Sequence, residues 1–598
     1  MTQNVIMKSF KENNRFLPTS AKEMKALGWD YVDVVLFSGD AYIDHPSFGA
    51  AIIARMLEKE GFRVAVVPQP NWKDDLRDFK KMGTPRLFFA VTSGAMDSMV
   101  NHYTANKRLR SNDAYTPEGK AGFRPDYACS VYSKILKDLY PNVPVVIGGI
   151  EASLRRFGHY DYWADKLKES ILLESKADIL VYGMAEKTMV ELAHKFNNKA
   201  SLQEILSTPQ IAYLSSVKPV DIELSAFEEC LKDKRKQAIN FKLVEEESNK
   251  YQSTQTIGQR FGKNMVIMNP PYQLLTTEEL DAIYDLPYTR KIHPRYKGKT
   301  IPAYDMIKHS VTMHRGCFGG CAFCTISAHQ GKFIVSRSAE SILKEIEKIA
   351  EEESFKGYIS DLGGPSANMY RLGGKDIEIC KKCKRPTCLH PKICPNLNTD
   401  HSEVLKLYSA VRKLPFIKKA FIGSGIRYDL ATDQYLKEVV KNHVSGRLKV
   451  APEHTNDAVL NLMRKPSFSL FKEFDKKFNK FNEEFNLNQQ LIPYFISSHP
   501  GCKPEHMAEL AIETKKLNFR LEQVQDFTPT PFTLATEIYY TGINPYTMEK
   551  VYTAKTAEQK NRQRSFFFWY KGEYKAEIKR FLKEIGRMDL LNQLGIRS

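Results

Sequence analysis

The sequence has no run of about eighteen or more apolar residues, which excludes a transmembrane helix. Its start, Met1 to Phe10, lacks a basic segment followed by an apolar core, so we expect no secretory leader and a cytoplasmic location. Acidic residues are also short in number: 70 Asp and Glu against 88 Lys and Arg give a net charge of +18. A basic excess permits RNA contact. Runs such as Lys232-Asp-Lys-Arg-Lys236 are mixed with acids, as solvated helix faces are, so RNA stays open as a partner.

Cysteine is scarce except in one region, because seven of the ten cysteines fall between positions 317 and 394. Clustered cysteines in a large chain without a leader favour metal ligands over disulfides. Cys317, Cys321 and Cys324 have x3-x2 spacing. Three thiolates in one loop can hold three corners of a cubic 4Fe-4S cluster and leave the fourth iron open for chemistry. The alternative is half of a zinc site, although zinc sites usually use paired Cys-x2-Cys units.

A second group of four cysteines lies within fifteen residues, with His390 among them. Four thiolates at this density predict a bound metal, because free thiols would be a redox liability. A structural zinc ion and a second iron–sulfur cluster both fit, and the sequence does not choose between them. The members are Cys380, Cys383, Cys388 and Cys394.

A chain of 598 residues is too long for one core and should divide into about three or four domains. Short apolar segments alternate with helical patterns in the first third, which predicts an open parallel α/β sheet for a Rossmann-like domain over 1–195. The polar stretch 196–302 is predicted to be a helical connector. The expected strands are 31–37, 62–68, 86–92, 143–147 and 178–182.

From about residue 303, strand-like segments precede helical ones six times, fewer than the eight units of a closed barrel. We expect a core barrel over 303–526, with a cysteine-rich insertion at 365–400, and a basic and aromatic extension over 527–598. Strand ends in barrels collect ligand-binding groups. Candidates for such contacts at three strand ends are Gly363, Gly364, Ser424 and Glu453.

The three-cysteine loop and the six-unit barrel resemble the radical S-adenosylmethionine (radical SAM) superfamily, whose core is a partial (β/α)6 barrel of the TIM type. The resemblance implies that the open iron binds S-adenosylmethionine, and that one electron, from a donor such as flavodoxin or ferredoxin, yields a 5′-deoxyadenosyl radical. It implies that Gly363 and Gly364 meet the methionyl amine, although Pro365 stands where the superfamily often has glutamate. Ser424 and Glu453 would contact the nucleoside.

The N-terminal domain resembles the cobalamin-binding-type domain found before many radical SAM barrels. The usual cobalamin loop reads Asp-x-His-x-x-Gly, whereas this chain has Asp44-His-Pro-Ser-Phe-Gly49, with histidine one place early. That departure weighs against cobalamin as a cofactor, since fold likeness alone does not establish function.

Six segments in this order resemble the YgiQ-type family of radical SAM proteins and extend nearly from end to end. The resemblance implies an enzyme that makes an adenosyl radical and supplies no substrate. Two alternatives stay open: a radical enzyme that modifies tRNA or the ribosome, and a non-catalytic metal-containing RNA-binding protein. The segments are Asp44–Gly49, Gly148–Ser153, Cys317–Cys324, Asp361–Tyr370, Cys380–Cys394 and Thr528–Phe532.

Overall fold

The computed structural model describes residues 15–521 and 524–596. The predicted absence of a leader over Met1 to Phe10 lies outside the described residues. So do Glu522 and Gln523, the first two residues of the last of the six expected strand segments, 522–526. The chain forms two compact units. Of the described residues, the first unit comprises 15–232, 252–309 and 337–347, and the second comprises 233–251, 310–336, 348–521 and 524–596. No helix in the described part is long and apolar enough to cross a membrane.

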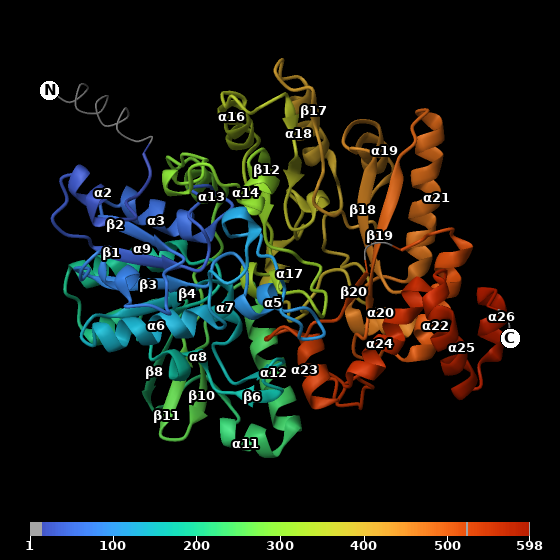
Figure 1. Ribbon diagram of the computed structural model, residues 1–598, viewed down its shortest axis with the longest axis horizontal. Helices are drawn as coiled ribbons and strands as arrows, with labels where there is room; N and C mark the ends of the chain where they lie inside the picture. Colours follow the sequence, from blue (N-terminus) through green and yellow to red (C-terminus); the bar gives the residue numbers. More distant parts are fainter. Residues whose placement is uncertain (1–14, 522–523, 597–598) are drawn as a thin grey trace. The chain divides into compact units, whose positions relative to one another are not determined.

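The first unit contains a nine-stranded sheet in the order β2-β1-β3-β4-β7-β8-β11-β10-β9 (Figure 1). Its first five strands are parallel, as the apolar segments of the sequence predict. Such strands need helices on both faces, because their side chains are apolar in both directions. The five are β1 (Val34–Ser38), β2 (Val64–Pro68), β3 (Phe88–Thr92), β4 (Val145–Gly148) and β7 (Ile179–Val181).

Helices cover both faces of this parallel region. Val34 and Leu36 of β1 join a core that includes residues of α3 (Gly49–Lys59) and α9 (Glu186–Asn197). Alternate side chains point the other way. There Phe37 stacks on Phe79 of α4 (Arg77–Lys80), which in turn contacts Tyr132 of α6 (Ala128–Leu139). The doubly covered sheet leaves its carboxyl edge as the place where polar loops gather.

The predicted helical connector is wrong in part, because residues 196–302 add four strands to the sheet. β8 pairs antiparallel with β7, and β10 and β11 form a hairpin that turns at Gly262, whose φ is +57°. The short runs Ile-Gly-Gln-Arg-Phe and Asn-Met-Val-Ile-Met are the signal that a search for long helices passes over. Helices such as α13 (Thr277–Tyr284) are also present. The added strands are β8 (Ile211–Ser216), β9 (Ile222–Leu224), β10 (Ile257–Phe261) and β11 (Asn264–Met268).

The second unit contains parallel strand pairs in chain order, with helices between the strands. β12 (Ser310–Thr312) pairs with β16 (Asp361–Gly363), and β15 (Tyr358–Ile359) pairs with β17 (Lys419–Ala420). β18 (Arg447–Glu453), β19 (Gln490–Ser497) and β20 (Val524–Asp526) form a three-stranded parallel sheet. The order confirms the expected open, barrel-like α/β arrangement. The intervening helices include α18 (Ser402–Arg412), α19 (Asp433–Asn442), α21 (Phe468–Glu484) and α22 (Pro504–Lys516).

The C-terminal extension is helical and packed. Phe566 and Phe567, in the 3-10 helix η4 (Phe566–Phe568), are fully buried. η4 lies against α22 and α24 (Ala557–Ser565). The aromatic side chains at these two positions therefore pack inside the second unit and are not available for stacking on bases.

Candidate functional site

The three-cysteine loop follows β12 and β13 (His314–Arg315), and glycines make its tight turns possible. Gly316 has a φ of +85°, and a Cβ atom there would lie 2.1 Å from the Phe333 carbonyl oxygen. The backbone N–H of Cys317 donates to the Gly331 carbonyl (3.1 Å), and that of Cys324 donates to the Cys321 carbonyl (3.1 Å). The backbone is thus folded back on itself around the cysteines.

The cysteines of this loop are half-buried, and their thiols are electrostatically coupled. Burial raises the pKa of Cys317 above its usual range, and the neighbouring Cys321 raises it further. Burial, with Cys321 and Cys317 nearby, raises the pKa of Cys324 to about 12. Each thiol influences the others because their sulfur atoms converge. A site of this kind disfavours free thiolates and favours a cation that shares their charge.

Arg427 places a cation beside the loop, which the sequence analysis did not predict. Its Nη1 lies 3.5 Å from Cys321 Sγ. Asp429 accepts two hydrogen bonds from the guanidinium, 2.8 Å from Nε and 2.6 Å from Nη2. The Asn368 side chain accepts from the Arg427 N–H (2.9 Å) and donates to its carbonyl (2.8 Å). The two hydrogen bonds to Asp429 and the two between Asn368 and the Arg427 backbone together hold the guanidinium beside the sulfur of Cys321.

Two of the predicted cosubstrate residues, Gly363 and Ser424, lie together. The Asp361 carboxylate accepts from the backbone N–H of Ser424 (3.0 Å) and from its hydroxyl (3.1 Å). A Cβ atom at Gly363 would lie 2.0 Å from the Ser424 hydroxyl oxygen. Burial raises the pKa of Asp361. Only glycine therefore permits the two strand ends to approach this closely.

Glu453 ends β18 in a strained conformation next to the cysteines. Its φ is +68°, a region that non-glycine residues rarely adopt, and its side chain is buried. Burial raises the pKa of Glu453, with Lys465 Nζ 3.9 Å from its carboxylate. Its charge is among those that raise the pKa of Cys324. The structure therefore brings Glu453 to the cysteine loop, while Gly364 lies against His314.

The four-cysteine insertion also gathers its thiols. Burial and the other three cysteines raise the pKa of Cys388 to about 11, although the nearby Lys332 lowers it. Burial likewise raises the pKa of Cys380, with Cys383 and Cys394 among its neighbours. Lys332 is buried and donates to the Arg385 carbonyl (2.7 Å). A buried ammonium group beside four thiols can compensate the charge of a metal–thiolate site.

The insertion is bound directly to the three-cysteine loop. The Cys388 N–H donates to the Phe318 carbonyl (3.0 Å), and the Thr387 hydroxyl donates to the Gly319 carbonyl (2.8 Å). Phe318 also joins an apolar cluster with Leu389 and Leu397 of the insertion. The two cysteine sets are thus parts of one packed assembly.

Neither cysteine set is arranged as a closed shell around one ion. Within 15–521 and 524–596, no group of three or more His, Cys, Asp or Glu side chains could hold a single metal ion as it stands.

A pocket opens beside the three-cysteine loop. It reaches the loop at Gly320, Cys321 and Cys324. Its other walls include Glu245 of α12 (Lys234–Ser248), Phe532 at the end of the Thr528–Phe532 segment, and Thr533, which follows it. The pocket gives solvent an approach to the loop from the side of the insertion and the C-terminal extension.

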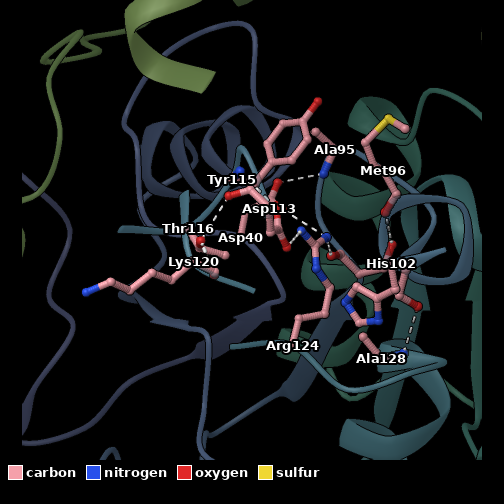
Figure 2. Close-up of polar contacts among 12 residues, drawn as sticks. Asp40, Ala95, Met96, His102, Asp113, Tyr115, Thr116, Lys120, Arg124 and Ala128 are labelled. Atoms are coloured by element: carbon pink, nitrogen blue, oxygen red, sulfur yellow. Dashed lines mark hydrogen bonds and ion pairs between the residues drawn. The ribbon is translucent and has the colours of Figure 1, made fainter. Parts of the chain in front are cut away.

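The carboxyl edge of the first unit's sheet carries a different kind of polar network. Figure 2 shows the Arg124 guanidinium between Asp40 and Asp113, at 3.1 Å and 2.9 Å. Arg124 also donates to the Ser93 carbonyl (2.7 Å), and the Ala95 N–H donates to Asp40 (2.6 Å). Burial raises the pKa of Asp40 to about 6. These charged groups hold the loops of the sheet edge to one another.

The segment compared with a cobalamin loop is used structurally. Asp44 forms a buried ion pair with Arg55 of α3, with Arg55 Nε 3.0 Å from Asp44 Oδ1. His45 is buried, and burial lowers its pKa well below the usual range. Its Nδ1 accepts from the Ser47 N–H (3.1 Å). Asp44 thus pairs with Arg55 of the following helix.

Comparison with known families gives three matches along the chain. Residues 16–310 match "Radical SAM N-terminal", residues 311–484 match "Radical SAM superfamily", and residues 522–594 match "Domain of unknown function (DUF3362)". A solved structure of the radical S-adenosylmethionine methyltransferase TsrM from Kitasatospora setae, with cobalamin and a [4Fe-4S] cluster bound, is also similar. It is 14% identical, with a TM-score of 0.48, over 84% of this chain and 74% of that chain.

The matched families and the cysteine loop define a radical SAM protein, as the sequence predicts. The chain belongs to the UPF0313 family. It is 61% identical to the UPF0313 protein of Bacteroides thetaiotaomicron, over 97% of this chain and 98% of that protein. It is 60% identical to the UPF0313 protein of Porphyromonas gingivalis, over 98% and 95% of the two chains.

Proposed function

We propose that this protein is an enzyme that uses a 4Fe-4S cluster and S-adenosylmethionine to generate a 5′-deoxyadenosyl radical, which abstracts hydrogen from a substrate. The observation that carries the proposal is the grouping of three half-buried cysteines in a loop with glycine turns, beside the Arg427 cation. A bound cluster would supply the electron that cleaves the sulfonium of the cosubstrate.

The residues of the loop fit the group they are proposed to hold. Cys317, Cys321 and Cys324 would be its ligands. Burial raises the pKa of Cys317 and Cys324, so these thiols give up their protons when iron binds to the sulfur atoms instead. Arg427 would donate to the Cys321 sulfur and offset the negative charge of the thiolates.

Four further residues are proposed for the cosubstrate. Gly363 and Gly364 would allow the methionyl amine of S-adenosylmethionine to approach the strand end closely, because glycine has no side chain. Ser424 and Glu453 would bind nucleoside hydroxyl groups. The positive φ of Glu453 supports this role, because backbone strain at a strand end is retained where a side chain must point at a ligand.

The insertion is proposed as a second metal site, either a further iron–sulfur cluster or zinc, held by Cys380, Cys383, Cys388 and Cys394. The support is the mutual approach of the thiols and the buried Lys332 beside them. Metal analysis of a Cys317→Ala/Cys321→Ala/Cys324→Ala variant separates the two cases. Iron and sulfide that persist in this variant assign a cluster to the insertion, and zinc alone assigns a structural ion.

The proposed function is tested on anaerobically reconstituted protein with dithionite as reductant. We expect iron and inorganic sulfide to bind and 5′-deoxyadenosine to be released from S-adenosylmethionine. A Cys321→Ala variant should release none above background, and release at the wild-type rate would reject the ligand assignment. Flavodoxin or ferredoxin is the proposed electron donor in place of dithionite. RNA as partner stays a prediction, tested by salt-dependent retention.

A further inference from the structure

His314 is the last buried histidine before the three-cysteine loop, and its imidazole has no partner within the described residues. The side chain is fully buried. Neither Nδ1 nor Nε2 makes a hydrogen bond. Buried polar groups are nearly always paired, because an unpaired one loses its bonds to water and gains nothing in return. The folded chain therefore carries an unfavourable group three residues before Cys317.

The same unit contains a buried histidine whose two ring nitrogens are both paired. His443, at the end of α19, is also fully buried. Its Nδ1 lies 2.7 Å from the Ala420 carbonyl, and its Nε2 lies 3.3 Å from the Glu438 carboxylate. The fold can satisfy both nitrogens of a buried imidazole, and it does so at His443 and not at His314.

The surroundings of His314 point toward the proposed cosubstrate residues. A Cβ atom at Gly364 would lie 2.5 Å from His314 Cε1 and 2.8 Å from Nδ1, so glycine is required for the imidazole to lie there. Gly363, next in the chain, meets Ser424 in the same way. Burial lowers the pKa of His314 to about 3. The neutral ring offers one N–H donor and one acceptor.

We infer that His314 is a binding residue for S-adenosylmethionine, whose polar groups complete the hydrogen bonds that the fold leaves open beside Gly364. The inference rests on the proposed function, since it places the cosubstrate at these glycines. A residue of this kind costs stability in the free protein and gains it in the complex. That combination distinguishes a ligand contact from a structural contact.

The test compares His314→Leu and His314→Gln with the wild type, all anaerobically reconstituted and with cluster content measured. Leucine removes both hydrogen-bonding atoms, and glutamine keeps a donor and an acceptor. We expect His314→Leu to bind S-adenosylmethionine about tenfold more weakly in equilibrium dialysis. Its melting temperature without ligand should equal or exceed that of the wild type. His314→Gln should recover most of the affinity.

His443→Gln is the matched control. It should lower the melting temperature without ligand, because it disturbs paired groups, and leave the affinity unchanged. Wild-type affinity in His314→Leu with a full cluster would overturn the inference, and so would a melting temperature well below that of the wild type. A wild-type protein that holds its cluster and binds no S-adenosylmethionine would reject the proposed function itself, which keeps the two failures distinct.

Discussion

Both units have polar groups at the carboxyl ends of parallel strands, but they differ in how these groups are paired. At the sheet edge of the first unit, Arg124 is shared by Asp40 and Asp113, and the buried Glu151 accepts from the N–H groups of Ser98 (3.0 Å) and Cys129 (2.9 Å). In the second unit, Arg427 lies 3.5 Å from the sulfur of Cys321, Lys465 lies 3.9 Å from the carboxylate of Glu453, and the buried His314 has neither ring nitrogen paired.

The difference separates polar groups that hold a fold from groups that await a ligand. A buried charge with a partner is tolerated, and removal of the partner is costly. A buried group without a partner persists only where something else compensates for it. We therefore propose that the coupled thiols and the unpaired His314 belong to the site of chemistry.

The largest expected effect comes from a matched pair of cysteine substitutions. Cys324→Ala should remove the iron of the three-cysteine loop and lower 5′-deoxyadenosine release more than about 100-fold, because a thiolate ligand is lost. Cys129→Ala, at a fully buried position in α6 of the first unit, should keep the iron and cost about 1–2 kcal/mol in the free energy of unfolding. Iron analysis, activity and urea denaturation measure the contrast. Equal iron contents in the two variants would contradict it.

The next largest effect is expected when Arg124, the cation that Asp40 and Asp113 share, is replaced. Arg124→Met leaves Asp40 and Asp113 buried without their partner, so we expect a loss of about 3–5 kcal/mol in the free energy of unfolding. Urea denaturation measures it, with Arg77→Met at an exposed position as the control. A loss below about 1 kcal/mol would show that the network does not depend on charge pairing.

The buried carboxyl group of Glu537 makes the stability of the second unit depend on pH, which gives a further test of the comparison. It lies in α23 (Leu534–Thr541) of the second unit, is buried, and accepts only from the Gln237 amide (3.2 Å) within the described residues. Burial raises the pKa of Glu537 from 4.5 to about 8. Because the folded state keeps a proton that the unfolded state releases, this contribution is complete below pH 4.5 and is lost as pH rises through 8.

Glu537→Gln should therefore be more stable than the wild type by roughly 1–3 kcal/mol near pH 8 and equal to it near pH 5. Urea denaturation as a function of pH measures the difference. A gap that does not change with pH would show that Glu537 does not titrate in this range.

The smallest effect concerns the connection between the cysteine sets. Thr387→Val removes the hydroxyl that donates to the Gly319 carbonyl (2.8 Å) and lies 3.2 Å from the Phe318 carbonyl oxygen, and it should cost about 1 kcal/mol. The rate of iron loss to a chelator should rise modestly, because the loop is less firmly held. Thr547→Val, at an exposed position in the second unit, is the control. Identical chelation rates in the two variants would argue against the connection.

Much of the fold was predictable from the sequence. The strands near 31–37, 62–68 and 86–92 stood out because fully apolar runs are needed where both faces of a sheet are covered. The strands between 211 and 268 were missed, because their short, partly polar segments resemble the helical stretches around them.

The site was predictable only in part. Cysteine spacing is a local property, so Cys317, Cys321 and Cys324 could be grouped from the sequence. Arg427 lies 106 positions after Cys321 in the sequence, and only the folded chain brings its guanidinium to that sulfur. The unpartnered state of His314 is likewise a property of everything around it.

The sequence by itself determined the two cysteine sets and the alternation of apolar strands with helices, because thiol spacing and side-chain periodicity are written into neighbouring residues. Tertiary structure alone decided which buried polar groups found partners. Pairing depends on atoms that are distant in the chain, as Arg124 with Asp40 and Asp113 and the unpaired His314 both show.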